Sequence, residues 1–238
     1  RVLNTYPGLN TVTLEAWIYP TTISGVHWII SNGRDCCTPT GGFNFYYSGT
    51  TLTGLIWRSA GSTQIGVSSA AGLITLNTWQ HIAMVYDGTK IQLFRNGVLI
   101  ATSATYAESS VMTGSNNLHI GILAYSVPGF YEFLGNIDDV RIWNNVRTQN
   151  EIVANMNKKL TGNEPWLRGY WNFENQNAND LSPYAGNGTF FGNSAIGQYP
   201  NNSLFTVSAV TDTVAIGDSS VVNVTISSTG LLIGTYND

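Results

Sequence analysis

The stretch Trp79-Gln-His-Ile-Ala-Met-Val-Tyr-Asp-Gly-Thr-Lys-Ile-Gln-Leu-Phe-Arg-Asn-Gly-Val-Leu-Ile-Ala101 decides the fold class of this chain. Its alternating apolar runs are separated by Asp87-Gly88 and Asn96-Gly97. Tight hairpin turns need residues that accept positive φ, so Asp-Gly and Asn-Gly between such runs are strong hairpin signals. The stretch therefore predicts a three-strand antiparallel meander, over Trp79–Tyr86, Ile91–Arg95 and Val98–Ala101.

The same period-two alternation continues on both sides of the meander. In Val12–Tyr19, one face would carry Val12, Leu14, Ala16 and Ile18, as expected for a strand buried on one side. Further strands are predicted around Trp28–Ser31, Phe43–Tyr47, Leu52–Arg58, Gln64–Val67, Leu118–Ile122, Ile137–Trp143 and Leu167–Phe173.

One helix interrupts the strands. Thr148 and Glu151 have the spacing of a capping box, in which each side chain satisfies a free N–H group of the first turn. Ile152, Met156 and Leu160 follow at helical spacing, and Gly162 can end the helix. The expected fold class is therefore all-β, with two antiparallel sheets and one short helix.

The composition limits the classes of function. The chain has 238 residues, 43% hydrophobic, 10% charged, with a net charge of −4. The apolar content excludes disorder, and no apolar run reaches the roughly 18 residues of a membrane span. Without a basic stripe, nucleic acid is not expected as a partner. Average globular proteins carry about 25% charged residues, so this weakly charged, Thr- and Asn-rich chain is expected to be extracellular or at the cell surface.

Two further features concern the cysteines and the extent of the chain. Cys36 and Cys37 are adjacent, so they cannot close a long loop; a strained vicinal disulfide, two free thiols and a partner outside the chain all stay open. Arg1 begins in what reads as a strand, which suggests a fragment of a longer protein. After about Tyr199 the pattern of residues along the chain changes. We therefore expect one domain over residues 1–200 and the truncated start of a second β domain over residues 204–238.

Several motifs, in order, resemble the laminin-G-like jelly-roll domains of the concanavalin A-like lectin/glucanase superfamily, bacterial type. They are Thr13–Pro20, Asn77–Lys90, Leu93–Val98, Leu118–Gly121, Gly135–Trp143, Arg147–Ile152, Leu160–Glu164 and Gly169–Phe173. The resemblance implies a two-sheet sandwich and mostly noncatalytic modules for adhesion or glycan binding, often with calcium. The tail resembles the start of an Ig-like module. The pentraxin type of double calcium site is not expected, because Ile122–Pro128 lacks acidic residues.

Calcium binding is expected at two places. In regular alternation, Val140 and Ile142 would lie on one face of the strand and Ile137 on the other. One extra residue near Asp138-Asp139 would bring all three to the same face, so the sequence predicts a β-bulge there. Asp138 shares the parity of Val140, so it is expected to point inward, where a carboxylate must be paired, hydrogen-bonded or metal-bound. Asp180 and Asn187 bound a turn rich in oxygen ligands. The alternatives are a buried aspartate bonded to backbone N–H groups and an ordinary Asx-turn.

Glycan binding is expected from exposed aromatic side chains. Ring faces cover the apolar faces of sugars, and polar groups orient the hydroxyls. Tyr125, Phe130 and Tyr131 lie in a Pro- and Gly-containing loop, while Trp57 and Arg58 end a predicted strand. Alternation also makes one of Tyr46 and Tyr47 point outward. Core packing is the alternative for all of these rings.

No catalytic pattern is found. Glucanases of this fold carry an E-x-D-x-x-E strand motif, and retaining enzymes need two carboxyl groups about 5–5.5 Å apart. Glu15, Glu132, Glu151 and Glu174 each lack an acid two residues later. We therefore expect no enzyme but a recognition or adhesion module for a polysaccharide or surface glycan. The alternatives are a spacer or protein–protein interaction domain that binds another surface protein, and a glycoside hydrolase or lyase or its ancillary domain.

Overall fold

The computed structural model describes residues 7–33, 42–57, 64–106, 112–113, 117–123, 131–174 and 177–190. The chain divides into two compact units, Arg1–Ile196 and Gly197–Asp238. The expected Ig-like module and the Cys36-Cys37 pair lie outside the described residues, so both stay predictions.

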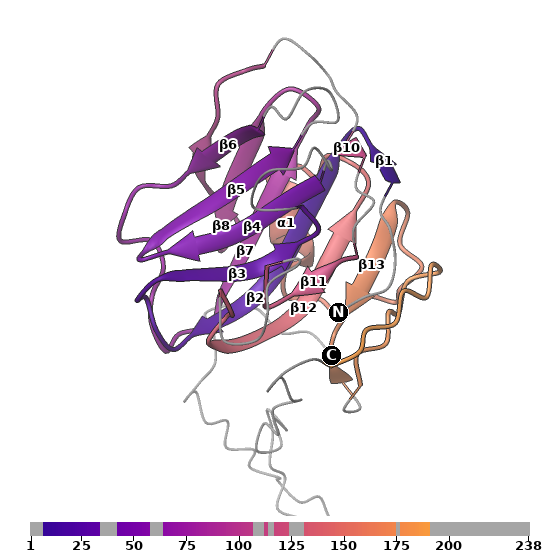
Figure 1. Cartoon of the computed structure of the whole chain (residues 1–238). Helices are drawn as coiled ribbons and strands as arrows, with labels where there is room; N and C mark the ends of the chain where they lie inside the picture. Colours follow the sequence, from indigo (N-terminus) through magenta and orange to yellow (C-terminus); the bar gives the residue numbers. More distant parts are fainter. Residues whose placement is uncertain are drawn as a thin grey trace, which may run out of the picture. The chain divides into compact units, whose positions relative to one another are not determined.

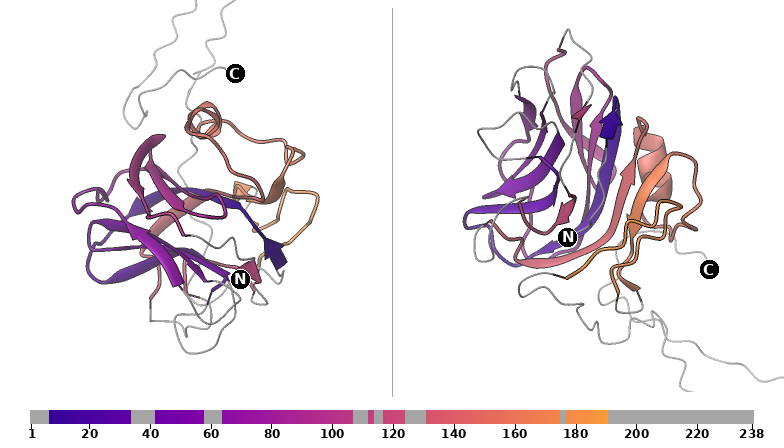
Figure 2. Two further views of the ribbon diagram at one scale, coloured as in Figure 1. Left: turned by 90° about the horizontal axis from the view of Figure 1, so that it is seen from above. Right: turned by 45° about the vertical axis from the view of Figure 1, so that its right-hand side comes forward.

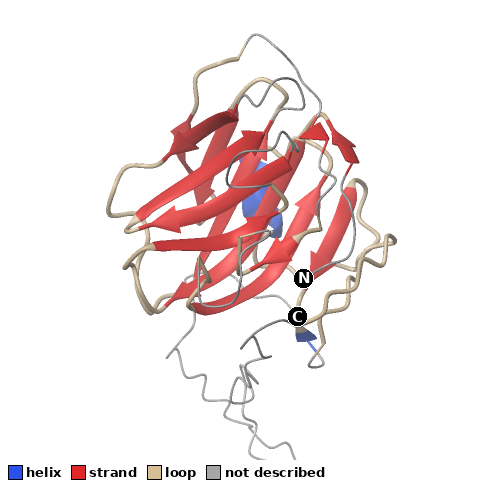
Figure 3. Ribbon diagram, in the orientation of Figure 1, coloured by secondary structure: helices blue, strands red, loops and turns tan. Residues whose placement is uncertain are grey.

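Two antiparallel sheets form the first unit, as the alternation predicted (Figures 1 and 3). The five-stranded sheet has the order β11-β3-β4-β5-β6, with β3 Val26–Ser31, β4 Gly42–Ser48, β5 Thr51–Trp57, β6 Gln64–Ser68 and β11 His119–Ile120. The six-stranded sheet has the order β13-β12-β2-β7-β8-β9, with β2 Val12–Pro20, β7 Gln80–Tyr86, β8 Ile91–Arg95, β9 Val98–Thr102, β12 Gly135–Trp143 and β13 Leu167–Trp171. A small ladder pairs β1 Pro7–Leu9 with β10 Met112–Thr113.

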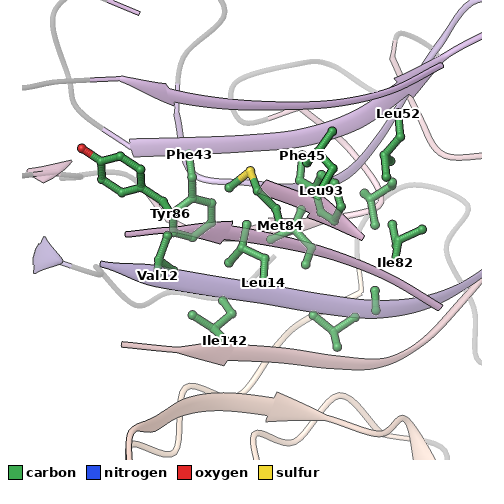
Figure 4. Close-up of a cluster of buried hydrophobic side chains, with 14 of the residues drawn as sticks. Val12, Leu14, Phe43, Phe45, Leu52, Ile82, Met84, Tyr86, Leu93 and Ile142 are labelled. Atoms are coloured by element: carbon green, nitrogen blue, oxygen red, sulfur yellow. The ribbon is translucent and has the colours of Figure 1, made fainter. Parts of the chain in front are cut away.

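The core lies between the inner faces of the two sheets. Val12 and Leu14 of β2 and Met84 of β7 are fully buried, and so is Phe45 from the opposite sheet. Figure 4 shows these side chains interleaving between the strands. The sheets approach closely at Gly54 of β5, where an added Cβ would lie 2.5 Å from Met84 Sδ. The fold is therefore the expected all-β sandwich with one short helix.

The meander is confirmed as β7, β8 and β9. Its second turn places Asn96 at φ 48° and Gly97 at φ 75°, the positive values that the Asn-Gly pair accepts most easily. In the first turn, the Asp87 carboxylate accepts hydrogen bonds from the backbone N–H groups of Thr89 and Lys90, both at 2.8 Å. These turns fix the register of the three strands.

Helix α1, Gln149–Asn155, begins with the predicted capping box. Thr148 N donates to Glu151 Oε2 at 2.7 Å, and Glu151 N donates to Thr148 Oγ1 at 3.3 Å. The helix lies on the outer face of the six-stranded sheet (Figure 2), where Ile152 packs on Ala83 of β7 in a buried cluster.

The helix ends earlier than the apolar spacing predicted, because side chains of the sheet take its C-terminal carbonyl groups. Arg141 donates to the carbonyls of Asn155 (2.8 Å) and Lys158 (2.6 Å). Trp17 Nε1 donates to the carbonyl of Met156 at 2.8 Å. The chain then turns, and Leu160 packs with Trp143 against the sheet instead of continuing the helical stripe.

The predicted bulge in β12 is confirmed, and it corrects the expected direction of Asp138. Asp138 is paired with Trp17 and Arg141 with Glu15, so β12 uses one residue more than β2 between these pairs. Asp139 sits in the bulge at φ 49°. Directly paired residues project to the same face, so Asp138 lies with Trp17 on the outer face. The inward orientation was wrong because the parity of Val140 does not carry across a bulge.

Candidate functional site

The outer face of the five-stranded sheet carries an aromatic and polar set of side chains. Phe43, Phe45 and Tyr47 of β4 point into the core, so Asn44 and Tyr46 point away from it. This confirms that one of the two adjacent tyrosines is outward, and shows that it is Tyr46.

Cross-strand pairing aligns the outward residues in a row. Trp28 on β3 is paired with Tyr46, and the centroids of their rings are 4.5 Å apart. Tyr46 is paired with Thr53 on β5, which is paired with Ser68 on β6. The hydroxyl oxygens of Thr53 and Ser68 are 2.9 Å apart. The row thus runs from two rings to two hydroxyls across four strands.

Trp57 and Asn44 lie together on this face. Trp57 is at the end of β5, paired with Gln64 on β6. A Cβ added to Gly33 would lie 3.0 Å from Trp57 Cδ1 and 3.1 Å from Asn44 Oδ1, so both side chains close over that glycine. We call the set the β4–β5 face; its residues are Trp28, Asn44, Tyr46, Thr53, Trp57, Gln64 and Ser68.

Exposure differs within the β4–β5 face. Trp28 is only 3% exposed, and its buried Nε1 has no hydrogen-bond partner among the residues that the structure describes. Tyr46 and Trp57 are half-buried, whereas Gln64 and Ser68 are exposed. Trp28 therefore supports the Tyr46 ring, and the accessible chemistry comes from Tyr46, Trp57 and the polar groups toward β6.

The structure describes only some of the residues that were predicted to bind a glycan. Trp57 lies on the β4–β5 face, whereas Arg58, Tyr125 and Phe130 lie outside the described residues and stay predictions. Tyr131 is 48% exposed with φ 59°. It precedes Glu132, which is bridged to Ile122 just beyond β11, so Tyr131 and Trp57 belong to different regions of the five-stranded sheet.

Sequence reasoning missed five residues of this face: Trp28, Asn44, Thr53, Gln64 and Ser68. Parity relative to Phe43 and Phe45 could have placed Asn44 outward. It could not have placed Trp28 beside Tyr46, because that pairing depends on the register between β3 and β4, which contains a bulge.

Asp180 and Asn187 come together but do not fit a calcium ion. The Asp180 carboxylate accepts hydrogen bonds from the backbone N–H groups of Tyr170 and Ser182, both at 2.9 Å, and of Gly186 at 2.8 Å. Asn187 Oδ1 accepts from Asp180 N at 3.0 Å. Because N–H groups point at these oxygens, the structure shows the buried, backbone-bonded aspartate that was the alternative at this site.

Asp138 has a different environment. Burial, and after it the neighbouring Asp139 and Glu174 carboxylates, raise the pKa of Asp138 to about 7. Its Oδ1 accepts the Asp139 N–H at 2.7 Å. In the described part of the chain, no group of three or more His, Cys, Asp or Glu residues could hold a metal ion. Calcium binding at Asp138 stays a prediction, and most of the ligand oxygens would have to come from groups other than carboxylates.

Replacing Asp138 with asparagine is expected to stabilise the protein at pH 8 and to have little effect below pH 4. The folded state holds the proton up to about pH 7, whereas the unfolded carboxyl loses it near its ordinary pKa of 3.8. Stability is therefore lost as pH rises between these values, at most about 1.4 kcal/mol per pH unit. Asparagine keeps the acceptor for Asp139 N and cannot ionise. Denaturant unfolding with a calcium chelator at both pH values measures the effect.

The same two proteins also test whether Asp138 binds calcium. If Asp138 binds calcium, adding the ion raises the melting temperature of the wild type at pH 8 and not that of D138N. An equal response of both proteins, or none in either, would remove Asp138 as a ligand. A destabilised D138N at pH 8 in chelator would contradict the direction of the pKa shift.

The outer face of the six-stranded sheet is closed by buried ionic groups. Glu15, His81 and Arg141 are at most 1% exposed, beneath α1 and the segment that follows it. Glu15 Oε2 lies 3.2 Å from His81 Nε2, and Glu15 Oε1 lies 3.5 Å from Arg147 Nε. The Arg147 guanidinium in turn covers the Trp143 ring at 3.9 Å. Burial opposes ionisation of Glu15, but His81, Arg141 and Arg147 outweigh it and lower the Glu15 pKa.

A family model matches residues 3–153, and its description is the concanavalin A-like lectin/glucanases superfamily. The chain belongs to this family. The two-sheet sandwich of the first unit is the fold that the sequence resemblance implied.

Solved structures share the fold at low sequence identity. A Bacteroides ovatus protein considered to bind carbohydrate has a TM-score of 0.60 and 20% identity, over 81% of this chain and 56% of that one. The CBM40 module of a Ruminococcus gnavus sialidase, bound to α2,3-sialyllactose, has a TM-score of 0.51 and 18% identity, over 61% of this chain and 82% of that one.

Curated relatives are much longer than this chain. Mouse pappalysin-1 is 33% identical over 78 residues, which are 33% of this chain and 5% of the relative. A Bifidobacterium longum α-L-arabinofuranosidase is 29% identical over 103 residues, which are 42% of this chain and 9% of the relative. The chain thus spans less than a tenth of either.

No helix among the described residues has the length and apolar character needed to cross a bilayer.

Proposed function

We propose that this domain is a noncatalytic recognition module that binds a polysaccharide or surface glycan on the β4–β5 face. The observation that carries the proposal is the outward placement of Tyr46 and Trp57 on one sheet face, with the exposed Gln64 and Ser68 on the next strand. The opposite sheet has its outer face covered by α1 and buried ion pairs. Half-buried rings next to amide and hydroxyl groups are the chemistry that binds sugars.

The relatives support the same class of ligand. One fold neighbour is bound to sialyllactose and another is considered to bind carbohydrate. A sequence relative acts on arabinofuranosides, by its name. We propose that Tyr131, exposed beyond β11, contacts the same extended glycan at a position apart from Trp57. We propose an extracellular or cell-surface location, in adhesion, as part of a longer protein.

The bonding of the buried acids supports a noncatalytic role. Glu15 is ion-paired with His81, and Asp180 is bonded to three backbone N–H groups. Asp139 accepts hydrogen bonds from Tyr170 and Arg141. Each of these three carboxylates therefore has a structural role.

A glycan panel tests the proposal. The panel contains arabinan, β-glucan and sialylated oligosaccharides, each measured with calcium and with a chelator. We expect binding that quenches or shifts tryptophan fluorescence, without release of products. Silence across the panel would favour a spacer or a protein-binding domain. Product release would overturn the noncatalytic role.

A further inference from the structure

His27, at the start of β3, is buried, and each of its two ring nitrogens faces a backbone carbonyl oxygen. Its Nδ1 lies 2.9 Å from the carbonyl oxygen of Glu132, and its Nε2 lies 3.0 Å from the carbonyl oxygen of Ser24. The side chain is 4% exposed. Carbonyl oxygens accept but cannot donate, and a neutral imidazole carries one N–H. Both contacts are hydrogen bonds only when both ring nitrogens are protonated.

One aromatic neighbour of His27 favours a cation, whereas burial of the imidazole opposes it. The ring stacks on Tyr47, with centroids 4.8 Å apart and planes at 29°, a geometry that stabilises a positive charge over an aromatic face. Burial raises the pKa of Tyr47, which therefore stays neutral. The loop Thr21–Gly25 has no titratable side chain, and the segment across from it brings Tyr131 and Glu132.

His27 is one of a few contacts that hold the segment 131–133. Glu132 is bridged to Ile122, and Phe133 N donates to the carbonyl of Gly121 at 2.8 Å. The Phe133 ring packs edge-on to Tyr47, at 5.8 Å between centroids. The backbone of Tyr131 has φ 59°, a strained value for a tyrosine. The His27–Glu132 hydrogen bond joins this segment directly to β3.

We propose that His27, protonated on both ring nitrogens, is a positioning residue that holds the segment 131–133 against β3. When the ring loses the proton on Nδ1, the hydrogen bond to the Glu132 carbonyl is lost and the segment opens more easily. This loss of a proton is what a ¹⁵N titration of the ring detects. The consequence of this opening for ligand binding rests on the proposed function, in which Tyr131 contacts the glycan.

Nuclear magnetic resonance and hydrogen exchange test the positioning without any ligand. The ¹⁵N shifts of His27 are expected to show two protonated nitrogens at low pH and the loss of one proton as pH rises. Over that transition the exchange protection of the Phe133 amide, corrected for intrinsic rates, should fall about tenfold, the loss expected for one charge-assisted hydrogen bond. A neutral His27 across the whole range would overturn the proposal.

Two variants make the test specific. His27→Gln cannot titrate and should remove the pH dependence of Phe133 protection. His119→Gln removes a histidine of the neighbouring β11, leaves the two His27 contacts in place and should keep the pH dependence. An H27Q protein that still shows the transition would refute the assignment. If H27Q does not fold, the ¹⁵N titration of the wild type decides alone.

Binding to the panel oligosaccharide is the last readout. The affinity of the wild type should fall over the same transition and that of H27Q should not. If no oligosaccharide binds while Phe133 protection follows His27, the proposed function fails and the positioning role stands. If binding is independent of pH while protection changes, the link between His27 and the ligand is overturned.

Discussion

Replacing Glu15 with glutamine is expected to lower the free energy of unfolding at pH 7 by about 3–5 kcal/mol. The carboxylate is fully buried, and it lies 3.2 Å from His81 Nε2 and 3.5 Å from Arg147 Nε. Glutamine has nearly the same shape but no charge, so it leaves a buried guanidinium without compensation. Such a loss is a large part of the 5–15 kcal/mol that stabilises a typical domain.

Denaturant unfolding of the wild type and E15Q measures this effect. Glu174→Gln is the control, since Glu174 is exposed and its replacement should change stability by no more than about 0.5 kcal/mol. The Glu15 pKa is lowered in the folded state. Its contribution is therefore complete above the unfolded value of 4.5 and is lost as pH falls below it. A loss in E15Q no larger than in the control would contradict a stabilising ion pair.

Replacing Trp57 or Tyr46 with alanine is expected to weaken glycan binding by about 10- to 100-fold. Aromatic residues at the centre of a binding surface commonly contribute 2 kcal/mol or more, and each 1.4 kcal/mol is tenfold in affinity. Both rings are outward-facing and half-buried on the β4–β5 face. Calorimetric titration with the panel oligosaccharide measures the loss.

Trp166 supplies the matched control for these variants. It is 63% exposed and immediately precedes β13, an edge strand of the other sheet. W166A should bind as the wild type does. Melting temperatures must show that W57A and Y46A are folded at the temperature of titration. Wild-type affinity in both folded variants would remove the β4–β5 face as the glycan site.

Local patterns were enough to predict most of the elements, although β1 and β10 were not predicted. The Asp-Gly and Asn-Gly turns fixed the meander, and the capping box fixed the start of α1 because it joins residues only three apart. The bulge at Asp138-Asp139 also followed from parity. The end of α1 could not be predicted in this way, because its last carbonyl groups bond to Arg141 and Trp17, which are distant in sequence.

The site was predicted only in part. Trp57 was proposed from its place on a predicted strand, and an outward tyrosine followed from alternation. Trp28 joined them through a strand register that no local signal specifies. Asp138 was placed on the wrong face, since a bulge reverses the parity on one side of it. The role of Asp180 depended on three N–H groups that the return of the chain beside β13 brings to its carboxylate.

The sequence by itself determined the strands, their turns, the start of the helix and the apolar face of each strand, because these depend on neighbours within a few residues. Only the tertiary structure decided which outward rings share a surface, which carboxylates are neutralised by partners, and that two carbonyl groups meet at His27. Those arrangements arise from pairing between strands far apart in the chain, where the free energy depends on packing and on desolvation of charge rather than on local preference.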